Sequence, residues 1–367
     1  MTSTASRPES LVGSFLRTWD RFWFTPADPT TLSFIRLCTG LLVLYVHITY
    51  CWDLFAYIGR DAWVDHEVAG FILRDTPQYH VPFDWSVPFQ PIETPALKAG
   101  NFYWSIYYHL TDPRWIVAVH AGFGVAMLLF ALGLWTRPMA LVTWVGAMAY
   151  VQRANSTVFG MDTMMMIVLL YLLLGPCGDT LSLDRWRLKR RARRAGEPEP
   201  PVPHTVAANF AVRLIQVHFC VVYLASGTTK LLGSTWWAGT ALNLVMLNPS
   251  FAPMDNDYYF NLVKYLASNR PLWEVLMWAG ILATLALEIA FCMLVWIPRY
   301  RWIMICSSVL LHAFIGVCMG LVSFSLMMMI FVSSFFPPSV IRAGLHTGGA
   351  FVRGFFASKQ PEPVAAA

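Results

Sequence analysis

The segment LWEVLMWAGILATLALEIAFCMLVWI, from Leu272 to Ile297, contains two charged residues, Glu274 near its start and Glu288 near its centre. A helix needs about 20 mostly apolar residues to cross the roughly 30 Å hydrocarbon core of a bilayer. This segment is long enough and apolar enough to do so. It therefore predicts a transmembrane helix and sets the fold class that the rest of the chain has to match.

The composition of the 367 residues agrees with that prediction. Hydrophobic residues make up 57% and charged residues 13%, and the mean hydropathy is +0.52. Soluble domains carry about 25% charged residues, so this chain has too few polar groups to cover soluble domains of its size. We expect an all-α integral membrane protein whose main partner is the lipid bilayer.

Seven further apolar runs lie along the chain. With Leu272–Ile297 they predict a bundle of about eight transmembrane helices and two larger extracytoplasmic loops, at residues 53–114 and 227–271. The seven are Ser33–Trp52, Trp115–Trp135, Pro138–Val151, Met161–Cys177, Val206–Ser226, Trp302–Met319 and Gly320–Phe336. Tryptophans at or near several predicted ends fit the headgroup level of a bilayer.

The distribution of basic residues predicts the orientation. Seven of the 26 Lys and Arg lie between Arg185 and Arg194, and the loops on that side of the membrane hold sixteen, against eight on the other side. Because basic loops stay in the cytoplasm, both termini are expected there. A topology signal explains this basic run without nucleic acid as a partner.

These boundaries divide the chain into five parts. They are a cytoplasmic segment 1–32, a first four-helix half 33–178, a basic, Pro-rich cytoplasmic loop 179–205, a second four-helix half 206–337 and a cytoplasmic tail 338–367, much of which we expect to be loosely ordered.

Ionisable residues inside the predicted spans are costly and need partners. Arg36 and Glu288 are interpreted as polar residues that help to hold the bundle together, and Arg36 is close enough to a helix end to extend toward the headgroups. His120, His218 and His312 lie in three different spans, which would permit them to meet inside the bundle. They do not form an i, i+4 pair, and the seven cysteines include no C-x-x-C, so no metal site is expected.

The segment YLASGTTKLLGSTWWAGTA, from Tyr223 to Ala241, combines a lysine with glycines and a tryptophan pair at the outer end of a span. In one interpretation Gly227 ends the helix, Lys230 extends to the outer headgroups, and Trp236 and Trp237 lie at the interface. In the other, Lys230 folds back into an apolar pocket, where loss of water favours a neutral amine that can act as a base.

Several short motifs, in order from about Phe15 to Pro338, resemble the vitamin K-dependent gamma-carboxylase superfamily, and in particular its bacterial HTTM (horizontally transferred transmembrane) domain proteins. The motifs are Phe34–Gly40, Leu132–Pro138, Asn155–Gly160, Tyr223–Gly227, Lys230 with Leu231, Trp236, Gly239, Glu288 and His312. The resemblance implies a bacterial cytoplasmic (inner) membrane protein.

The resemblance also implies a chemistry. It places Lys230 on the base that deprotonates vitamin K hydroquinone, on the outer side of the membrane, and implies a vitamin K-like quinol as a lipid-soluble substrate. Asn155, Tyr223, Trp236, Trp237 and His312 would line that site. The sequence contains no motif for a nucleotide, haem or iron–sulfur cofactor.

Two departures from the family limit this implication. Asn155 stands where the family has a histidine, and an amide cannot be protonated to stabilise a carbanion. The large lumenal domain that recognises the protein substrate is absent from this sequence. Binding or oxidation of a quinol is therefore favoured over carboxylation of protein glutamates.

The competing hypothesis is a membrane transporter or scaffold without enzymatic activity, in which Arg36, Glu288 and the histidines line a pathway or hold helices together. The lack of an internal repeat weighs against a transporter.

Overall fold

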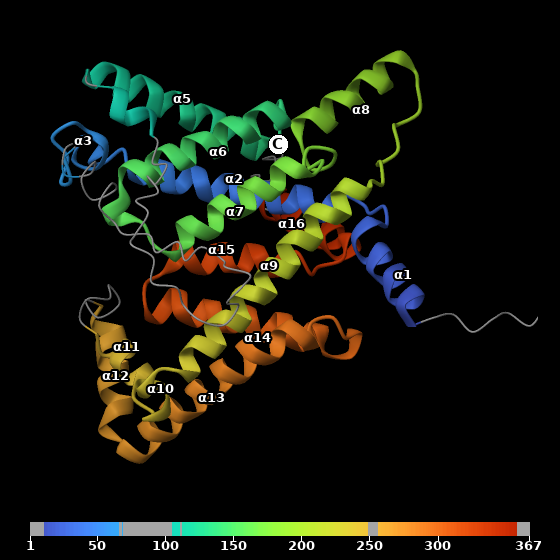
Figure 1. The fold of residues 1–367 in the computed structure, drawn as a ribbon. Helices are drawn as coiled ribbons and strands as arrows, with labels where there is room; N and C mark the ends of the chain where they lie inside the picture. The colour runs from blue at the N-terminus through green and yellow to red at the C-terminus, as the bar shows by residue number, and fades with distance from the viewer. Residues whose placement is uncertain (1–10, 66–67, 69–104, 111, 249–255, 358–367) are drawn as a thin grey trace, which may run out of the picture.

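The computed structural model describes residues 11–65, 68, 105–110, 112–248 and 256–357, and the regular elements in these ranges are all helices. One isolated antiparallel bridge, between Ala27 and Thr205, is the exception. The predicted all-α class is confirmed for the described part of the chain. The long helices run roughly side by side across the molecule (Figure 1).

The first half contains α1 (Leu11–Phe24), α2 (Thr30–Thr49), α3 (Leu54–Ile58), η1 (Ile106–His109), α5 (Pro113–Leu132), α6 (Thr136–Arg153), η2 (Asn155–Thr157) and α7 (Gly160–Leu174). Next comes α8 (Leu183–Ala195). The second half contains α9 (Val206–Leu231), α10 (Ser234–Trp237), α11 (Ala241–Met246), α12 (Asp257–Ser268), α13 (Arg270–Leu294), α14 (Pro298–Cys318), α15 (Val322–Ser333) and α16 (Pro338–Ala357).

Each of the eight apolar runs coincides with one helix, and five of these helices are long and apolar enough to cross a membrane: α2, α5, α9, α13 and α14. The apolar helices α7 and α15 are shorter, with 15 and 12 residues. At 1.5 Å per residue they rise by about 22 and 18 Å, which is less than a hydrocarbon core of about 30 Å. The structure supports a membrane-embedded helical protein and leaves the number of crossings open.

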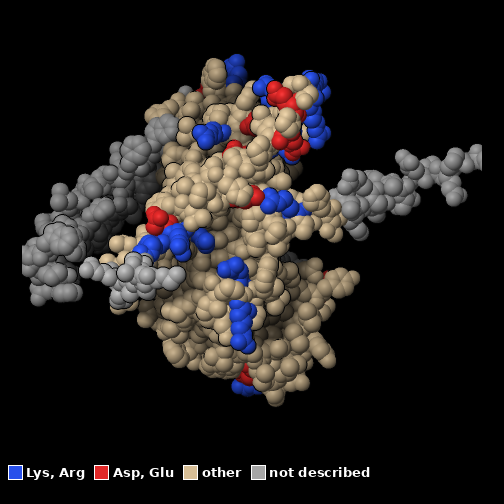
Figure 2. Space-filling model, turned by 90° about the vertical axis from the view of Figure 1, so that its right-hand side faces the viewer, with Lys and Arg blue, Asp and Glu red and all other residues tan. Residues whose placement is uncertain are grey.

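The two ends of the bundle differ. The helices α1 and α8 lie at one end, while the short helices α3, α10, α11 and α12 lie at the other (Figure 1). Figure 2 looks onto the first end and shows Lys and Arg spread over it. Hydrogen bonds from Asn209 Nδ2 to the Phe22 and Trp23 carbonyls, 2.8 and 3.0 Å long, join α9 to α1 at this end.

Aromatic packing joins the helices of the second half. Phe219 on α9 lies 5.1 Å from Phe291 on α13 and 5.7 Å from Phe331 on α15, measured between ring centroids. All three rings are buried. Aromatic pairs at these separations add to the energy of burial, so this cluster fixes the α9 and α13 faces that carry the polar residues described below.

Three segments contain more helix than the sequence predicted. The fifth span does not end at Gly227, because α9 continues to Leu231. The basic segment 179–205 contains α8, whose start is capped by the Ser182 side chain accepting a hydrogen bond from Arg185 N. The tail after Pro337 begins with α16 rather than a loose chain.

The described residues of segment 227–271, which was predicted as an outer loop, include the helices α10, α11 and α12. The Trp273 side chain at its end is buried, and its Nε1 donates to Asn243 Oδ1 over 2.9 Å. Of the other predicted outer loop, 53–114, the structure describes α3, η1 and the residues next to them, and residues 66–67, 69–104 and 111 lie outside the described residues.

Candidate functional site

Lys230 and Glu288 form a partly buried ion pair between α9 and α13. Lys230 Nζ lies 2.7 Å from both Glu288 Oε1 and Oε2, and 2.5 Å from Ser226 Oγ. The lysine side chain is 23% exposed and the glutamate side chain 10%. An ammonium has three N–H donors, and all three have a protein acceptor here. Lys230 therefore turns into the bundle instead of extending to the headgroups.

The local sequence explains why these side chains meet. Ser226 and Lys230 are four residues apart on α9 and so lie on the same face of the helix. Gly227 lies between them and lets α13 approach. A Cβ at this position would come within 2.9 Å of Ile289 Cγ1 and 3.1 Å of Glu288 Cβ. The glycine expected to break the helix instead permits the close helix crossing that brings Glu288 to Lys230.

Lys230 lines an open groove of about 490 Å³ at the end of α9. Its wall includes Ser226, Thr229, Lys230 and Trp236. The centroid of the Trp236 ring lies 5.4 Å from Lys230 Nζ, which is cation–π distance. A ligand in this groove can therefore reach an amine, a hydroxyl and an aromatic face.

Two arrangements of one proton leave the pair without net charge. An ammonium with a carboxylate and an amine with a carboxylic acid both have zero net charge. A proton can therefore move between Lys230 and Glu288 without leaving an unpaired charge in a site with little water. In the second state Nζ has a free lone pair, which is what a base requires.

Tyr223 and His312 form a second polar cluster on the same face of α9. Tyr223 is seven residues before Lys230, about 10.5 Å along the helix. Its hydroxyl lies 2.6 Å from Ser308 Oγ and 2.7 Å from His312 Nε2, both on α14. Tyr223 and His312 are buried, so this cluster links α9 to α14 beneath the groove and does not line it.

Trp237 and Asn155 are not among the groups that the structure brings to Lys230. Trp237 is 68% exposed, and its Nε1 donates to the Leu231 carbonyl over 2.6 Å. It points away because α10 is a single turn in which neighbouring side chains diverge. Asn155 begins η2, between α6 and α7, and its side chain lies outside the described part of the structure.

The three intramembrane histidines do not converge. His312 contacts Tyr223, whereas His218 Nδ1 lies 3.1 Å from the Tyr171 hydroxyl. His120 lies on α5 beside His47. Each ring has a partner on a neighbouring helix. Within the described residues there is no group of three His, Cys, Asp or Glu that could hold a metal ion.

Arg36 is fully buried near the opposite end of the bundle. Its guanidinium donates to three backbone carbonyls: Leu181 at 2.6 Å, Cys177 at 3.3 Å and Ala131 at 3.4 Å. These carbonyls belong to the last residues of α5 and to the turns after α7. Arg36 therefore binds carbonyl groups at the end of α5 and after α7, and it does not extend to the headgroups.

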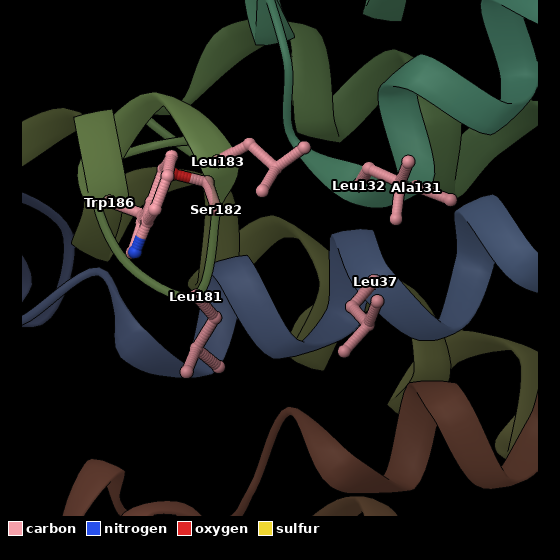
Figure 3. Close-up of a pocket in the computed structure, with 7 residues that line it drawn as sticks. All are labelled: Leu37, Ala131, Leu132, Leu181, Ser182, Leu183 and Trp186. Atoms are coloured by element: carbon pink, nitrogen blue, oxygen red, sulfur yellow. The ribbon is translucent and has the colours of Figure 1, made fainter.

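A second groove, of about 400 Å³, lies near Arg36, between α2, α5 and the start of α8 (Figure 3). Its wall consists of leucines, Ala131, Ser182 and Trp186. None of these side chains is an acid or a base at neutral pH. It lacks the proton chemistry of the Lys230 groove.

Ser226 and Ser308 were not predicted as site residues. Ser226 had no signal, because the predicted helix ended at Ser226 and Lys230 lay in the predicted loop after it. Ser308 had none, since its contact with Tyr223 joins residues 85 positions apart.

Comparison of the chain with family models, with curated proteins and with solved structures finds no match in any of the three.

Proposed function

We propose that this protein is an integral membrane enzyme that binds a lipid-soluble, quinol-like substrate in the Lys230 groove and uses Lys230 as the base that deprotonates it. The observation that carries the proposal is the Lys230–Glu288 pair, bonded over 2.7 Å, in which Lys230 lines a groove together with Trp236. The resemblance of the Tyr223–Trp237 motif to the carboxylase superfamily supports the same substrate class.

In the proposed step Glu288 takes one proton from Lys230, and the freed Nζ takes the hydroxyl proton of the quinol. The substrate becomes a phenolate, the electron-rich form that dioxygen oxidises. Trp236 offers a flat aromatic face against which the quinol ring can stack. The residues of this site do not include the family histidine at the Asn155 position, so protein glutamate carboxylation is not part of the proposal.

The test is oxidation of menadiol, a short quinol, by the purified protein in lipid nanodiscs. Lys230→Arg keeps the positive charge but cannot act as a base. We expect its rate to fall by about 100-fold or more, while the control Lys264→Arg, at an exposed lysine of α12, matches the wild type. Equal rates for Lys230→Arg and the wild type would rule out Lys230 as the base.

The second candidate is a scaffold or transporter in which Lys230 and Glu288 hold helices together. The close approach of α9 and α13 at Gly227 favours it, because the ion pair joins the same two helices. This function predicts a wild type without activity on any quinol and a Lys230→Arg variant of normal stability.

We also propose eight crossings with both termini in the cytoplasm of a bacterial cell, resting on the sixteen to eight distribution of Lys and Arg. The shorter helices α7 and α15 would cross together with the turns at their ends. A cysteine introduced at Gly196 tests the orientation. Labelling of that cysteine by an impermeant reagent added outside intact cells would contradict it.

A further inference from the structure

A thiol, an imidazole and a phenol meet near α3, beside a groove that has no residue in common with the Lys230 groove. Cys51 Sγ lies 3.5 Å from His120 Nε2, and the Tyr107 hydroxyl lies 3.3 Å from His120 Nδ1. Cys51 is exposed, whereas His120 and Tyr107 are buried. Both nitrogens of one ring are therefore engaged, one by a reactive group open to the surface and the other by a buried partner.

His47 fixes the orientation of the His120 ring. The two imidazoles stack with centroids 3.7 Å apart and an angle of 17° between their planes. His47 Nε2 donates to the His120 backbone carbonyl over 2.8 Å. In the tautomer with its proton on Nδ1, His120 donates to the Tyr107 hydroxyl and its Nε2 has a lone pair that faces Cys51 Sγ. The Cys51 thiol also lies 4.0 Å from the His47 carbonyl. This is the arrangement of a nucleophile, a base and a group that orients the base.

Cys51 and His120 both line an open groove of about 540 Å³. Its other walls are mostly apolar, with Trp52, Leu54, Phe55 and Val117, and Asp53 is at its edge. Cys51 lies two residues after the end of α2, next to the C-cap residue Tyr50. The groove therefore offers an apolar chain a place beside a thiol at the end of the membrane-crossing helices.

We propose that Cys51 and His120 form an acyl-transfer site, in which the Cys51 thiol takes an acyl group from a lipid-like ester bound in this groove. His120 accepts the thiol proton as sulfur attacks the ester carbonyl carbon. The new S–C bond forms, the C–O bond to the alcohol breaks, and His120 returns the proton to the alcohol oxygen. The products are S-acyl-Cys51 and the free alcohol. Tyr107 and His47 are positioning residues.

The first measurement is acylation of the purified protein by p-nitrophenyl octanoate, read by peptide mass spectrometry and by release of nitrophenolate. We expect one acyl group on Cys51, no acylation at this position in Cys51→Ser, and a rate about 100-fold lower in His120→Ala. Added imidazole should restore part of the His120→Ala rate, which a purely structural role for His120 would not allow.

A reference cysteine separates proximity to His120 from simple exposure. Lys264→Cys places a thiol on an exposed position of α12. Iodoacetamide should label Cys51 faster than this reference, and His120→Ala should slow Cys51 while leaving the reference unchanged. Equal labelling of the two cysteines, together with no effect of His120→Ala on acylation, would overturn the proposal.

Tyr107→Phe serves if His120→Ala does not fold. It removes the hydroxyl at His120 Nδ1 but keeps the buried ring. We expect the maximal rate of nitrophenolate release to fall by about tenfold with an unchanged KM. A variant with wild-type maximal rate would remove Tyr107 from the site. Because these measurements do not involve Lys230 or any quinol, their outcome is independent of the function proposed above.

Discussion

Arg36 and Lys230 are both cations inside apolar helices, but the protein surrounds them differently. Arg36 is fully buried, and its Nη1 and Nη2 donate to three backbone carbonyls. Lys230 is paired with the carboxylate of Glu288 and borders a groove. Carbonyls cannot take up a proton, whereas a carboxylate can. The first cation therefore joins the end of α5 to the turns after α7, whereas the second has the carboxylate neighbour that the proposed base requires.

The largest effect is expected from Glu288→Leu, which leaves the Lys230 ammonium without its carboxylate. Removing one partner of a buried pair costs about 3 kcal/mol or more. Glu288→Gln keeps an acceptor and should cost about 1 kcal/mol. Both variants are heated in detergent, and the folded fraction that remains is measured by size-exclusion chromatography. The measurement compares the thermal stability of the two variants. Wild-type stability for Glu288→Leu would mean that the pair does not hold α9 and α13 together.

Exchanging the two cation types sharpens the comparison. Arg36→Lys loses the two-pronged guanidinium that reaches several carbonyls at once, and we expect it to cost about 2 kcal/mol of stability. Lys230→Arg keeps its charge and should cost less than about 1 kcal/mol. The same heating assay compares them. If Lys230→Arg is the more destabilised variant, the contrast between the two sites is wrong.

A smaller effect is expected from Gly227→Ala. The added methyl group would meet Ile289 Cγ1 at 2.9 Å, so α9 and α13 have to move apart slightly. Overpacking of this kind costs about 1 kcal/mol or more. Gly122→Ala is a suitable control, because nothing lies within 4 Å of a Cβ added at that position. Loss of stability in both variants alike would point to helix effects unrelated to the crossing.

The smallest effect concerns pH and lies outside the membrane-crossing helices. Burial raises the pKa of Asp28, but hydrogen bonds from Thr30 and Arg342 outweigh it and hold that pKa below its usual value of 3.8. Arg342 Nη1 lies 2.8 Å from Asp28 Oδ2 and ties α16 to the start of α2. This contribution to stability is present above the usual pKa and is lost as the pH falls through the lowered one.

Asp28→Asn should therefore flatten the loss of thermal stability below about pH 4. His204 Nε2 lies 4.0 Å from Asp28 Oδ2. The variant His204→Gln is the control for a contribution of this histidine to the pH profile. An unchanged pH profile for Asp28→Asn would show that the link between α16 and α2 adds nothing to stability.

The positions of the long helices followed from the sequence because apolar length alone makes a segment favour the bilayer. Their ends did not follow as well. Gly227 was interpreted as a helix end from its residue type, yet it lies within α9. Its role is to leave space for α13, since a side chain at this position would meet Ile289 and Glu288. A residue's local preference cannot show that a second helix passes beside it.

The candidate sites divide in the same way. Lys230 and Glu288 could be picked out one at a time, since any charge inside a span is costly and needs a partner. That each is the other's partner, over 58 residues of chain, was decided by the crossing of α9 and α13. Cys51, His120 and Tyr107 come from three separate segments, and their spacing in the sequence carries no signal of contact. The sequence by itself determined which segments are apolar and where the charges are, because these depend on each residue alone. Only the tertiary structure decided which side chains meet, because that depends on how the helices pack.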